Sequence, residues 1–209
     1  MKRIVLLCMI TVYLVRHGQT EENLQRIFQG HLPGVLTKEG RLQAMGLRSQ
    51  LACVPLDAVV SSDLQRVIDT VNLAFGSDAD LGRAVDLSCE SAEERVLEKK
   101  EFVLHRGHKL TWERTKLLRE IDWGSWTGLL IASVDTSKLP ADAESKEMLY
   151  ERAGRFVEYL KAHYEGKTVL VVAHGLVNRS IQAQIEGVGV EHLYDVPHMK
   201  NAEMRKFVL

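Results

Sequence analysis

The chain alternates short apolar runs with longer amphipathic segments. Three apolar runs predict strands: "ITVYLV" at 10–15, "DAVVSS" at 57–62 and "KTVLVVA" at 167–173. The first and third are rich in β-branched residues and apolar throughout, which is typical of strands buried on both faces of a sheet. Two further strands are predicted at "KLLREI", 116–121, and at "NAEMRKFVL", 201–209.

Amphipathic helices are predicted between these strands. One covers 36–52 with Thr37 as its N-cap, one follows the strand at 57–62, and the others lie at 144–166 and 176–187. Because strands and helices alternate, the sequence predicts an α/β protein of three layers, α/β/α, around a mostly parallel central sheet. In the second helix, apolar residues recur at helical spacing: Leu64, Val67, Ile68, Val71, Ala74 and Phe75.

A highly charged insertion at residues 76–115 interrupts this alternation. It contains "SAEERVLEKKEFVLHRGHKL", in which Ser91 and Glu94 have the spacing of a capping box and predict the start of a helix. The insertion is longer than a simple connection from a helix to a strand. We therefore expect it to lie outside the central sheet, over one edge of the sheet or over the functional site.

Length and charge limit the classes of protein. The 209 residues suit one domain, 1–209, because no repeat and no Pro/Gly/Ser-rich linker divides them. A formal net charge of −1 creates no field that would attract nucleic acid or an anionic membrane, so neither is an expected partner. Any handling of phosphate must then depend on a local cluster of cations.

The cysteines and the N-terminus bear on the cellular compartment. Cys8, Cys53 and Cys89 are odd in number and share no short spacing, so they predict neither a disulfide framework nor a metal site. The start, "MKRIVLLCMITVYLV", imitates a signal peptide, but no small-x-small cleavage site follows and the run is too short to span a bilayer. We expect a cytoplasmic protein whose natural start is Met1 or Met9.

Polar side chains follow four of the predicted strands. Arg16 and His17 come directly after the first strand, and Arg66 lies one turn into the helix after the second. Glu120 closes "KLLRE", and His174 follows "TVLVVA". In open α/β sheets, ligands bind at the carboxyl ends of the strands. The sequence therefore predicts that two histidines, two arginines and one glutamate meet at one rim of the sheet.

This set of side chains suits phosphoryl transfer without a metal. Guanidinium groups match phosphate oxygens in bidentate fashion. A neutral imidazole can attack phosphorus while a second, protonated imidazole stabilises the oxyanions. A carboxylic acid can protonate the departing oxygen and later, as the carboxylate, activate water. Because the cations would neutralise the charge for which kinases and GTPases use Mg²⁺, we expect neither a metal nor another cofactor.

Four motifs carry a resemblance to a known family: "VRHGQTEENLQRIFQGHLPGVLTKEGRLQAMGL", "SSDLQRVIDT", "LLREIDWGSWTG" and "VVAHGLVNRS". A single RHG tripeptide is weak evidence, whereas the four motifs in this order are specific. The chain resembles the histidine phosphatase superfamily, in the branch that contains the cofactor-dependent phosphoglycerate mutases. The resemblance covers most of the chain except the charged insertion, and it implies a phosphoglycerate mutase-like fold.

The resemblance also implies a role for each residue at the rim. His17 would be the nucleophile that becomes phosphohistidine, and Glu120 would be the proton donor. Alone, each of these residues has an ordinary structural explanation, such as a surface cation, a satisfied structural histidine or a turn residue. Three further residues would complete the catalytic set and bind the phosphate: Arg16, Arg66 and His174. Three others would help to bind the phosphate: Asn23, Gln29 and Gly175.

Two further histidines, His105 and His108 in "HRGH", could suggest a metal site. The insertion offers them no spaced cysteine or carboxylate partners, so a solvated loop is the better interpretation. No metal ligand is therefore predicted.

Three activities fit these residues. A phosphatase passes the phosphoryl group from His17 to water, a mutase returns it to a phosphorylated acid, and an inert relative only binds phosphorylated ligands. The acid lies in "REIDWGSWTG", the phosphatase-like form, and "LLIASVDTSKLPADAESKEM" holds two lysines and no arginine, a poor clamp for a second phosphate. We expect a phosphatase acting on a small phosphorylated metabolite, with mutase activity second. The sequence leaves the substrate and the oligomeric state open, as either monomer or homodimer.

Overall fold

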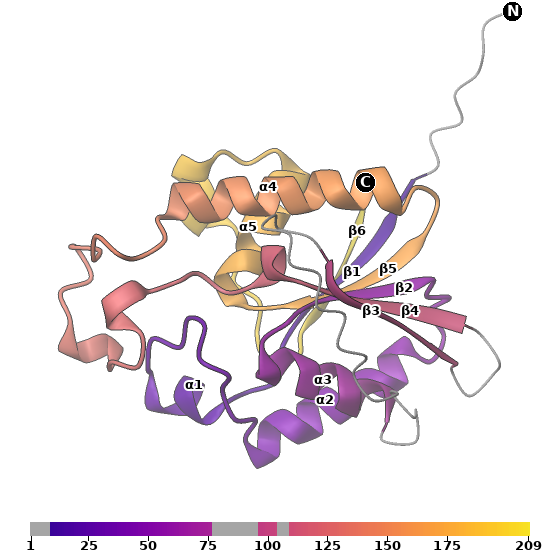
Figure 1. Cartoon of the computed structure of the whole chain (residues 1–209), viewed down its shortest axis with the longest axis horizontal. Helices are drawn as coiled ribbons and strands as arrows, with labels where there is room; N and C mark the ends of the chain where they lie inside the picture. The colour runs from indigo at the N-terminus through magenta and orange to yellow at the C-terminus, as the bar shows by residue number, and fades with distance from the viewer. Residues whose placement is uncertain (1–8, 77–95, 104–108) are drawn as a thin grey trace, which may run out of the picture.

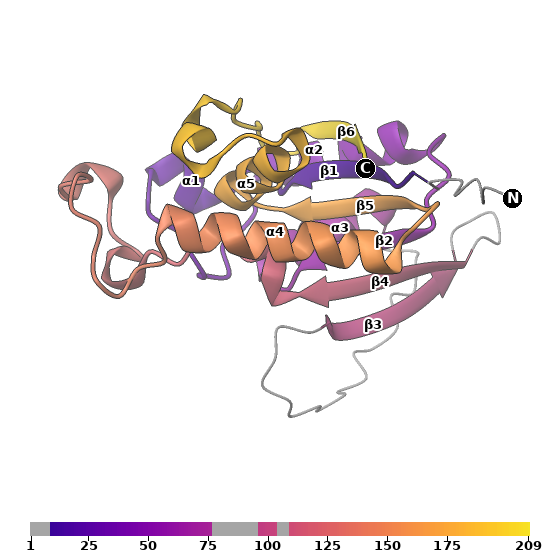
Figure 2. The ribbon, with the colours of Figure 1, turned by 90° about the horizontal axis from the view of Figure 1, so that it is seen from above.

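A computed structural model describes residues 9–76, 96–103 and 109–209. Within these residues six strands form one sheet in the order β3-β4-β2-β5-β1-β6 (Figure 1, Figure 2). Strands β4, β2, β5 and β1 are parallel to one another, whereas β3 and β6 run antiparallel at the two edges. This confirms the mostly parallel sheet. The strands are β1 (Thr11–Arg16), β2 (Ala58–Ser62), β3 (Val96–Val103), β4 (Lys109–Thr115), β5 (Thr168–Ala173) and β6 (Met204–Val208).

Helices cover both faces of the sheet, as predicted for a three-layer protein. Helices α4 (Lys146–His163) and α5 (Gly175–Glu186) lie on one face, and α2 (Lys38–Leu51) and α3 (Gln65–Phe75) lie on the other (Figure 1, Figure 2). The shorter helical elements lie in the connections: α1 (Glu21–Gln25) and the 3-10 helices η1 (Lys116–Leu118), η2 (Gly124–Trp126), η3 (Ile131–Ser133) and η4 (Val190–Asp195).

The apolar core forms on both faces because successive side chains of a strand point in opposite directions. In β5, Val169 and Val171 belong to the cluster that includes α4 and α5. Leu170 and Val172 belong to the cluster on the side of α2 and α3. The continuous apolar run of β5 is therefore explained by burial on both faces, as its sequence indicates.

The carboxyl ends of the parallel strands meet at one rim of the sheet. Arg16, at the end of β1, is paired with Ala173 at the end of β5. Ser62, at the end of β2, is paired with Thr115 at the end of β4. Because β6 is antiparallel to β1, it begins with Met204 at this same rim. The segments that follow β1, β2, β4 and β5 and the segment that precedes β6 therefore converge.

Two predictions for the middle of the chain are wrong. "KLLREI" is not a strand: β4 ends at Thr115, η1 follows, and Glu120 lies in the loop after η1. The insertion at 76–115 does not lie outside the sheet, because both β3 and β4 belong to it. The physical reason is visible in "KLTWERT", where Leu110 and Trp112 are buried and alternate with polar residues in the manner of a strand.

Two other predictions concern the insertion. The capping box formed by Ser91 and Glu94 and the histidines His105 and His108 lie outside the described residues. They remain predictions.

Candidate active site

His17 lies directly after β1, in the turn that leads to α1. Its backbone N–H donates to the carbonyl oxygen of Ala173 at 3.0 Å, which ties the turn to the end of β5. Gly18 then lets the chain pass close to the start of α2, since a Cβ atom there would lie 2.4 Å from the carbonyl oxygen of Gly40. This close approach explains the glycine of the RHG motif, and it fixes the backbone from which the His17 side chain extends.

The His17 side chain is buried and its tautomer is defined by one hydrogen bond. Nδ1 lies 2.7 Å from the carbonyl oxygen of Gly18, and because a carbonyl only accepts, Nδ1 carries the proton. Nε2 therefore keeps the lone pair that a nucleophile needs. Burial lowers the pKa of His17 well below its usual range, and the charges of Arg66 and Arg16 lower it further. His17 is thus a neutral imidazole at neutral pH.

His174 follows β5 and faces His17, with the two ring centroids 5.2 Å apart. Arg66 donates from Nε to Nδ1 of His174 at 3.1 Å, so Nε2 carries the proton and donates it to Ser62 Oγ at 2.9 Å. Burial, and then the charge of Arg66, lower the pKa of His174 well below its usual range. Nδ1 of His174 carries no proton in this arrangement, because it faces the Nε–H donor of Arg66. The second, protonated imidazole expected during phosphoryl transfer remains a prediction.

Arg66 lies in the first turn of α3, and none of its surface is exposed. Nη2 donates to the carbonyl oxygen of Gly30 at 2.9 Å, and Nη1 donates to that of Leu32. Burial lowers the pKa of Arg66 to about 10, so the guanidinium still carries its charge at neutral pH. Arg66 is therefore a fixed positive charge beside both histidine rings.

Arg16, the last residue of β1, supplies a second cation. Nη1 donates to the carbonyl oxygen of Met199 at 2.9 Å and to Nε2 of His198 at 2.8 Å. The Nε atom of Arg16 is buried, and it has no hydrogen-bond partner within the described part of the chain. Because buried donors are normally satisfied, this N–H indicates a place for an acceptor such as a phosphate oxygen.

Glu120 covers the first turn of α5 with its carboxylate. Oε1 accepts from the backbone N–H of Ile121 at 3.0 Å and from those of Leu176 and Val177 at 3.2 Å each. Of these three N–H groups, Oε2 accepts only from that of Leu176, at 3.2 Å. The carboxylate thus satisfies N–H groups that a helix leaves unpaired at its N-terminus. Oε2 keeps the greater capacity for a further contact.

Gly175 marks the point where these groups converge. A Cβ atom on this residue would lie 3.1 Å from Cε1 of His198 and 3.5 Å from both Nε of Arg16 and Oε2 of Glu120. The free N–H of one arginine and the less occupied oxygen of the glutamate therefore lie over the same glycine. The geometry brings together His17, His174, Arg16, Arg66, Glu120 and Gly175.

Comparison with known proteins decides the family. The sequence profile of the histidine phosphatase superfamily (branch 1) matches residues 12–82 and 81–209. The chain belongs to the histidine phosphatase superfamily. A relative from Hydrogenobacter thermophilus, named "Putative phosphoserine phosphatase 2", is 30% identical over 192 residues, which span 91% of this chain and 85% of that protein. A 2,3-bisphosphoglycerate-dependent phosphoglycerate mutase from Streptococcus pneumoniae is 29% identical over 205 residues, spanning 90% and 89%.

Solved structures of similar proteins have the same fold. The α-ribazole phosphatase from Shigella flexneri has a TM-score of 0.72 at 21% identity, over 94% of this chain and 89% of that chain. A mycobacterial glucosyl-3-phosphoglycerate phosphatase has a TM-score of 0.71 at 23% identity, over 96% and 90%. These likenesses confirm the phosphoglycerate mutase-like architecture. The relatives include both phosphatases and a mutase, so the family alone leaves open which reaction this histidine phosphatase homologue performs.

Asn23 lies at the edge of the candidate site, at the end of a short chain of hydrogen bonds. Its Oδ1 accepts from Nδ2 of Asn201 at 3.2 Å, and Nδ2 also donates to the carbonyl oxygen of His17 at 3.1 Å. Asn23 is thus linked to the backbone of the candidate nucleophile through Asn201. Its predicted contact with phosphate remains a prediction.

Gln29 is buried beside Arg66, but its amide group bonds within the loop. Nε2 donates to Oγ1 of Thr20 and to Oε2 of Glu22, at 3.0 Å in both cases. A Cβ atom on Gly34 would lie 2.3 Å from this Nε2 and 3.1 Å from Cδ of Arg66. Gly34 therefore lies close to both side chains, and the amide hydrogens of Gln29 are already used within the loop.

Two side chains at the rim, His198 and Asn201, are not among those that the sequence predicts there. Both precede β6, which is antiparallel to β1 and so begins where β1 ends. An edge strand that runs antiparallel to the first strand brings the residues before it to the rim where the first strand ends. The local sequence pattern does not show which strand the last strand pairs with, so it could not place these two residues at the rim.

The described residues offer neither a metal site nor a membrane-spanning helix. Among the residues described, no group of three or more His, Cys, Asp or Glu side chains is arranged to hold a metal ion. Over the same residues, no helix is both long enough and apolar enough to cross a membrane. That the enzyme works without a metal remains a prediction.

Proposed function

We propose that this histidine phosphatase homologue is a phosphatase that hydrolyses phosphate monoesters of small molecules through a phosphohistidine on His17, without a metal. The observation that carries the proposal is the position of the His17 Nε2 lone pair, in a buried site with two guanidinium groups and Oε2 of Glu120. The odd, unspaced cysteines fit a reducing compartment such as the cytoplasm.

In the first step, the phosphate dianion binds between Arg16 and Arg66, which match its oxygens with N–H donors. Nε2 of His17 attacks phosphorus, and the bond between phosphorus and the ester oxygen breaks. Glu120, protonated for this step, transfers its proton to the departing oxygen, so an alcohol leaves. The N–H of His17 at Nδ1 stays bonded to the Gly18 carbonyl oxygen, which stabilises the charge on the phosphorylated ring.

In the second step, water attacks the phosphohistidine. The carboxylate of Glu120 accepts a proton from the attacking water, and the bond between Nε2 and phosphorus breaks. Its electron pair returns to His17, inorganic phosphate leaves, and Glu120 is protonated again for the next turnover. The two arginines bind the transferring group in both steps.

Charges around the site favour a phosphatase over a mutase, which must bind a second anionic group. Lys138 and Lys146, the two lysines that could serve as a clamp, lie near the carboxylates of their sequence neighbours at 3.6 Å and 3.7 Å. Lys138 has 83% of its side chain exposed, as expected for a solvated surface residue. The carboxylate of Glu22 is close enough to act on Arg66 by its charge, and it would repel a second anion that approached from the same side.

The names of similar proteins support phosphatase chemistry without deciding the substrate. They include a phosphoserine phosphatase, an α-ribazole phosphatase and a glucosyl-3-phosphoglycerate phosphatase. The mutase from Streptococcus pneumoniae, matched over 89% of its length, makes mutase activity the second candidate. Both reactions share the phosphohistidine step and differ in the acceptor.

The proposal is tested by phosphate release from p-nitrophenyl phosphate in EDTA. We expect the wild type to release phosphate and His17→Ala to fall to background, because the lone pair of the second imidazole, at Nδ1 of His174, already accepts from Nε of Arg66. His163→Ala is the matched control, since His163 ends α4 near the start of β5, away from the rim, and is exposed. It should retain wild-type activity, and both variants should keep the wild-type circular dichroism spectrum.

Two outcomes would overturn the phosphohistidine on His17 or its independence from a metal. One is phosphate release by His17→Ala at a rate within a few-fold of the wild type. The other is activity that EDTA abolishes and Mg²⁺ restores. If the folded wild type releases no phosphate but interconverts 3-phosphoglycerate and 2-phosphoglycerate, the enzyme is a mutase.

A further inference from the structure

An ion pair lies beside the loop that carries Glu120, outside the set of residues that meets the phosphate. Arg152, on α4, and Glu144, just before α4, have only 11% and 12% of their side chains exposed. Arg152 donates from Nε to Oε1 of Glu144 at 2.8 Å and from Nη2 to Oε2 at 2.7 Å. The ion pair is therefore bidentate and mostly shielded from water, unlike an ordinary solvent-exposed ion pair.

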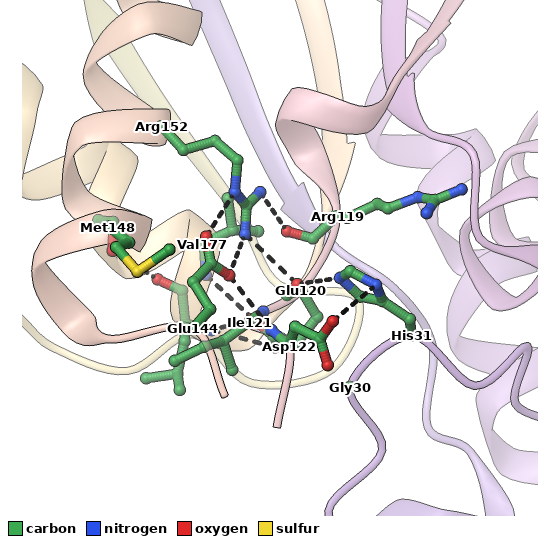
Figure 3. A network of polar contacts seen from close by, with 12 residues as sticks. Gly30, His31, Arg119, Glu120, Ile121, Asp122, Glu144, Met148, Arg152 and Val177 are labelled. Carbon is green, nitrogen blue, oxygen red and sulfur yellow. Dashed lines mark hydrogen bonds and ion pairs between the residues drawn. The ribbon is translucent and has the colours of Figure 1, made fainter. Parts of the chain in front are cut away.

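The other N–H groups of Arg152 bind the backbone of the Glu120 loop (Figure 3). Nη1 donates to the carbonyl oxygens of Leu117 at 2.9 Å and Arg119 at 2.8 Å. Nη2 makes a longer contact, 3.4 Å, to the carbonyl oxygen of Glu120 itself. One guanidinium thus fixes three carbonyl groups within four residues, up to the residue that we propose as proton donor.

Glu144 and His31 hold the other side of the same residue. Oε2 of Glu144 accepts from the backbone N–H of Asp122 at 3.2 Å, and the backbone N–H of Glu144 donates to the carbonyl oxygen of Asp122 at 2.7 Å. Nε2 of His31 donates to the carbonyl oxygen of Glu120 at 2.9 Å (Figure 3). The backbone is therefore held on both sides of Glu120, by partners from α4 and from the loop after α1.

We propose that Arg152 is a positioning residue for the proton donor Glu120, with Glu144 as the counter-charge that orients its guanidinium. The inference rests on the proposed function, in which Oε2 of Glu120 must reach the leaving oxygen. Arg152 touches no reacting atom, and it acts by fixing the backbone from which the Glu120 side chain extends. A lysine could not replace it, because an ammonium group cannot bind a carboxylate in bidentate fashion and reach three carbonyls at once.

This role has a chemical signature that a general loss of stability lacks. A proton donor matters greatly when the leaving group is a poor one, such as the phenolate of phenyl phosphate. It matters little when the leaving group is as stable an anion as that of 2,4-dinitrophenyl phosphate. A displaced Glu120 should therefore slow the first substrate selectively, whereas a smaller folded fraction slows both substrates equally.

The experiment measures kcat/KM for both substrates in wild type, Arg152→Lys, Glu144→Gln and two reference variants. Glu120→Gln defines the effect of losing the proton donor, and Arg155→Lys is the matched control, an exposed arginine on the same helix. The ratio of the two kcat/KM values does not depend on how much of the enzyme is folded. It therefore remains informative even if a variant is unstable.

We expect Arg152→Lys and Glu144→Gln to lower kcat/KM for phenyl phosphate by about ten- to a hundredfold while changing that for 2,4-dinitrophenyl phosphate by less than about threefold. Glu120→Gln should shift the ratio in the same direction and further, and Arg155→Lys should leave it at the wild-type value. An unchanged ratio in Arg152→Lys and Glu144→Gln, with a shifted ratio in Glu120→Gln, overturns this inference and leaves the proposed function intact. An unchanged ratio in Glu120→Gln would show that Glu120 is not the proton donor, and it would overturn this inference as well.

Discussion

At the scale of single residues, the site buries positive charge in advance of its ligand. Arg66 is bound by two carbonyl oxygens and a neutral imidazole, and the charges of Glu120 and Glu22 act on its guanidinium. Buried charge is costly unless it is paired, and a phosphate dianion would supply a counter-charge in direct contact with the two arginines. Burial, and then the charges of the two arginines that would attract the anion, lower the pKa of His17 and keep it neutral and nucleophilic.

The buried histidines predict how stability depends on pH. The pKa values of His17 and His174 are lowered in the folded protein, whereas in the unfolded chain each returns to about 6.5. Below that pH the unfolded state binds more protons, so stability is lost as the pH falls. Each histidine contributes a slope of up to about 1.4 kcal/mol per pH unit between about pH 6.5 and its folded pKa.

Urea denaturation between about pH 7 and about pH 5 measures this effect, because the window begins above the ordinary histidine pKa of about 6.5 and extends below it. The free energy of unfolding of the wild type should fall across it. His174→Gln removes one of the two buried histidines, so its slope should be shallower by up to about 1.4 kcal/mol per pH unit. Identical slopes for the two proteins would show that His174 is protonated in the folded state.

The sequence could predict which residues meet at the rim but not their protonation. Strand ends locate Arg16, His17 and His174, because the carboxyl ends of parallel strands share an edge. The tautomers depend on the Gly18 carbonyl and on where Nε of Arg66 points, and both are set by tertiary structure. For this reason the neutral state of His174 in this arrangement could not be read from the sequence.

At the scale of elements, the turn after β1 depends on its contact with the start of α2. Thr37 caps α2 by accepting from the backbone N–H of Gly40, and the carbonyl oxygen of Gly40 approaches Gly18. Gly18 also donates its N–H to Oγ1 of Thr70 on α3, at 3.1 Å. The backbone next to the nucleophile is therefore fixed between two helices of the same layer.

Gly18→Ala should disturb this junction. The added methyl group would lie 2.4 Å from the Gly40 carbonyl oxygen, a backbone atom that cannot turn aside. We expect a loss of about 1–3 kcal/mol in the free energy of unfolding, together with lower activity, because the turn that carries His17 must shift. Thermal and urea denaturation with assays on p-nitrophenyl phosphate provide the measurement.

Gly46→Ala is the matched control within α2, since a methyl group at this exposed position meets nothing within 4 Å. It should stabilise the protein by about 0.5–1 kcal/mol through helix propensity and leave activity unchanged. If Gly18→Ala behaved like Gly46→Ala, the close approach would have no part in fixing the nucleophile.

Local pattern predicted the central elements better than those around the insertion. The strands now seen as β1, β2 and β5 and the helices α2 to α5 carry clean apolar periods, and all of them are confirmed. "KLLREI" has the composition of a strand, but Leu117 and Leu118 are buried in a 3-10 turn that closes the end of β4. A short apolar run does not distinguish a strand from a buried turn. The predicted strand therefore lies directly after the real one, β4.

At the scale of the whole molecule, the site joins the two ends of the described chain. His17 follows the first strand of the sheet, and His198 and Asn201 precede the last, beside it. With a formal net charge of −1, the molecule as a whole has no marked attraction for anions. Recognition of a phosphate must therefore come from the local cluster that this convergence builds.

In the proposed mechanism a phosphoryl group passes through His17 to water. A rapid-quench experiment in alkali with a ³²P-labelled aryl phosphate, followed by mapping of the labelled peptide, tests this transfer. We predict an acid-labile, alkali-stable label on the peptide that contains His17, which forms before inorganic phosphate appears and decays at the rate of turnover. Phosphate release by the wild type with no label on that peptide, or equal labelling of His17→Ala, would contradict the claim.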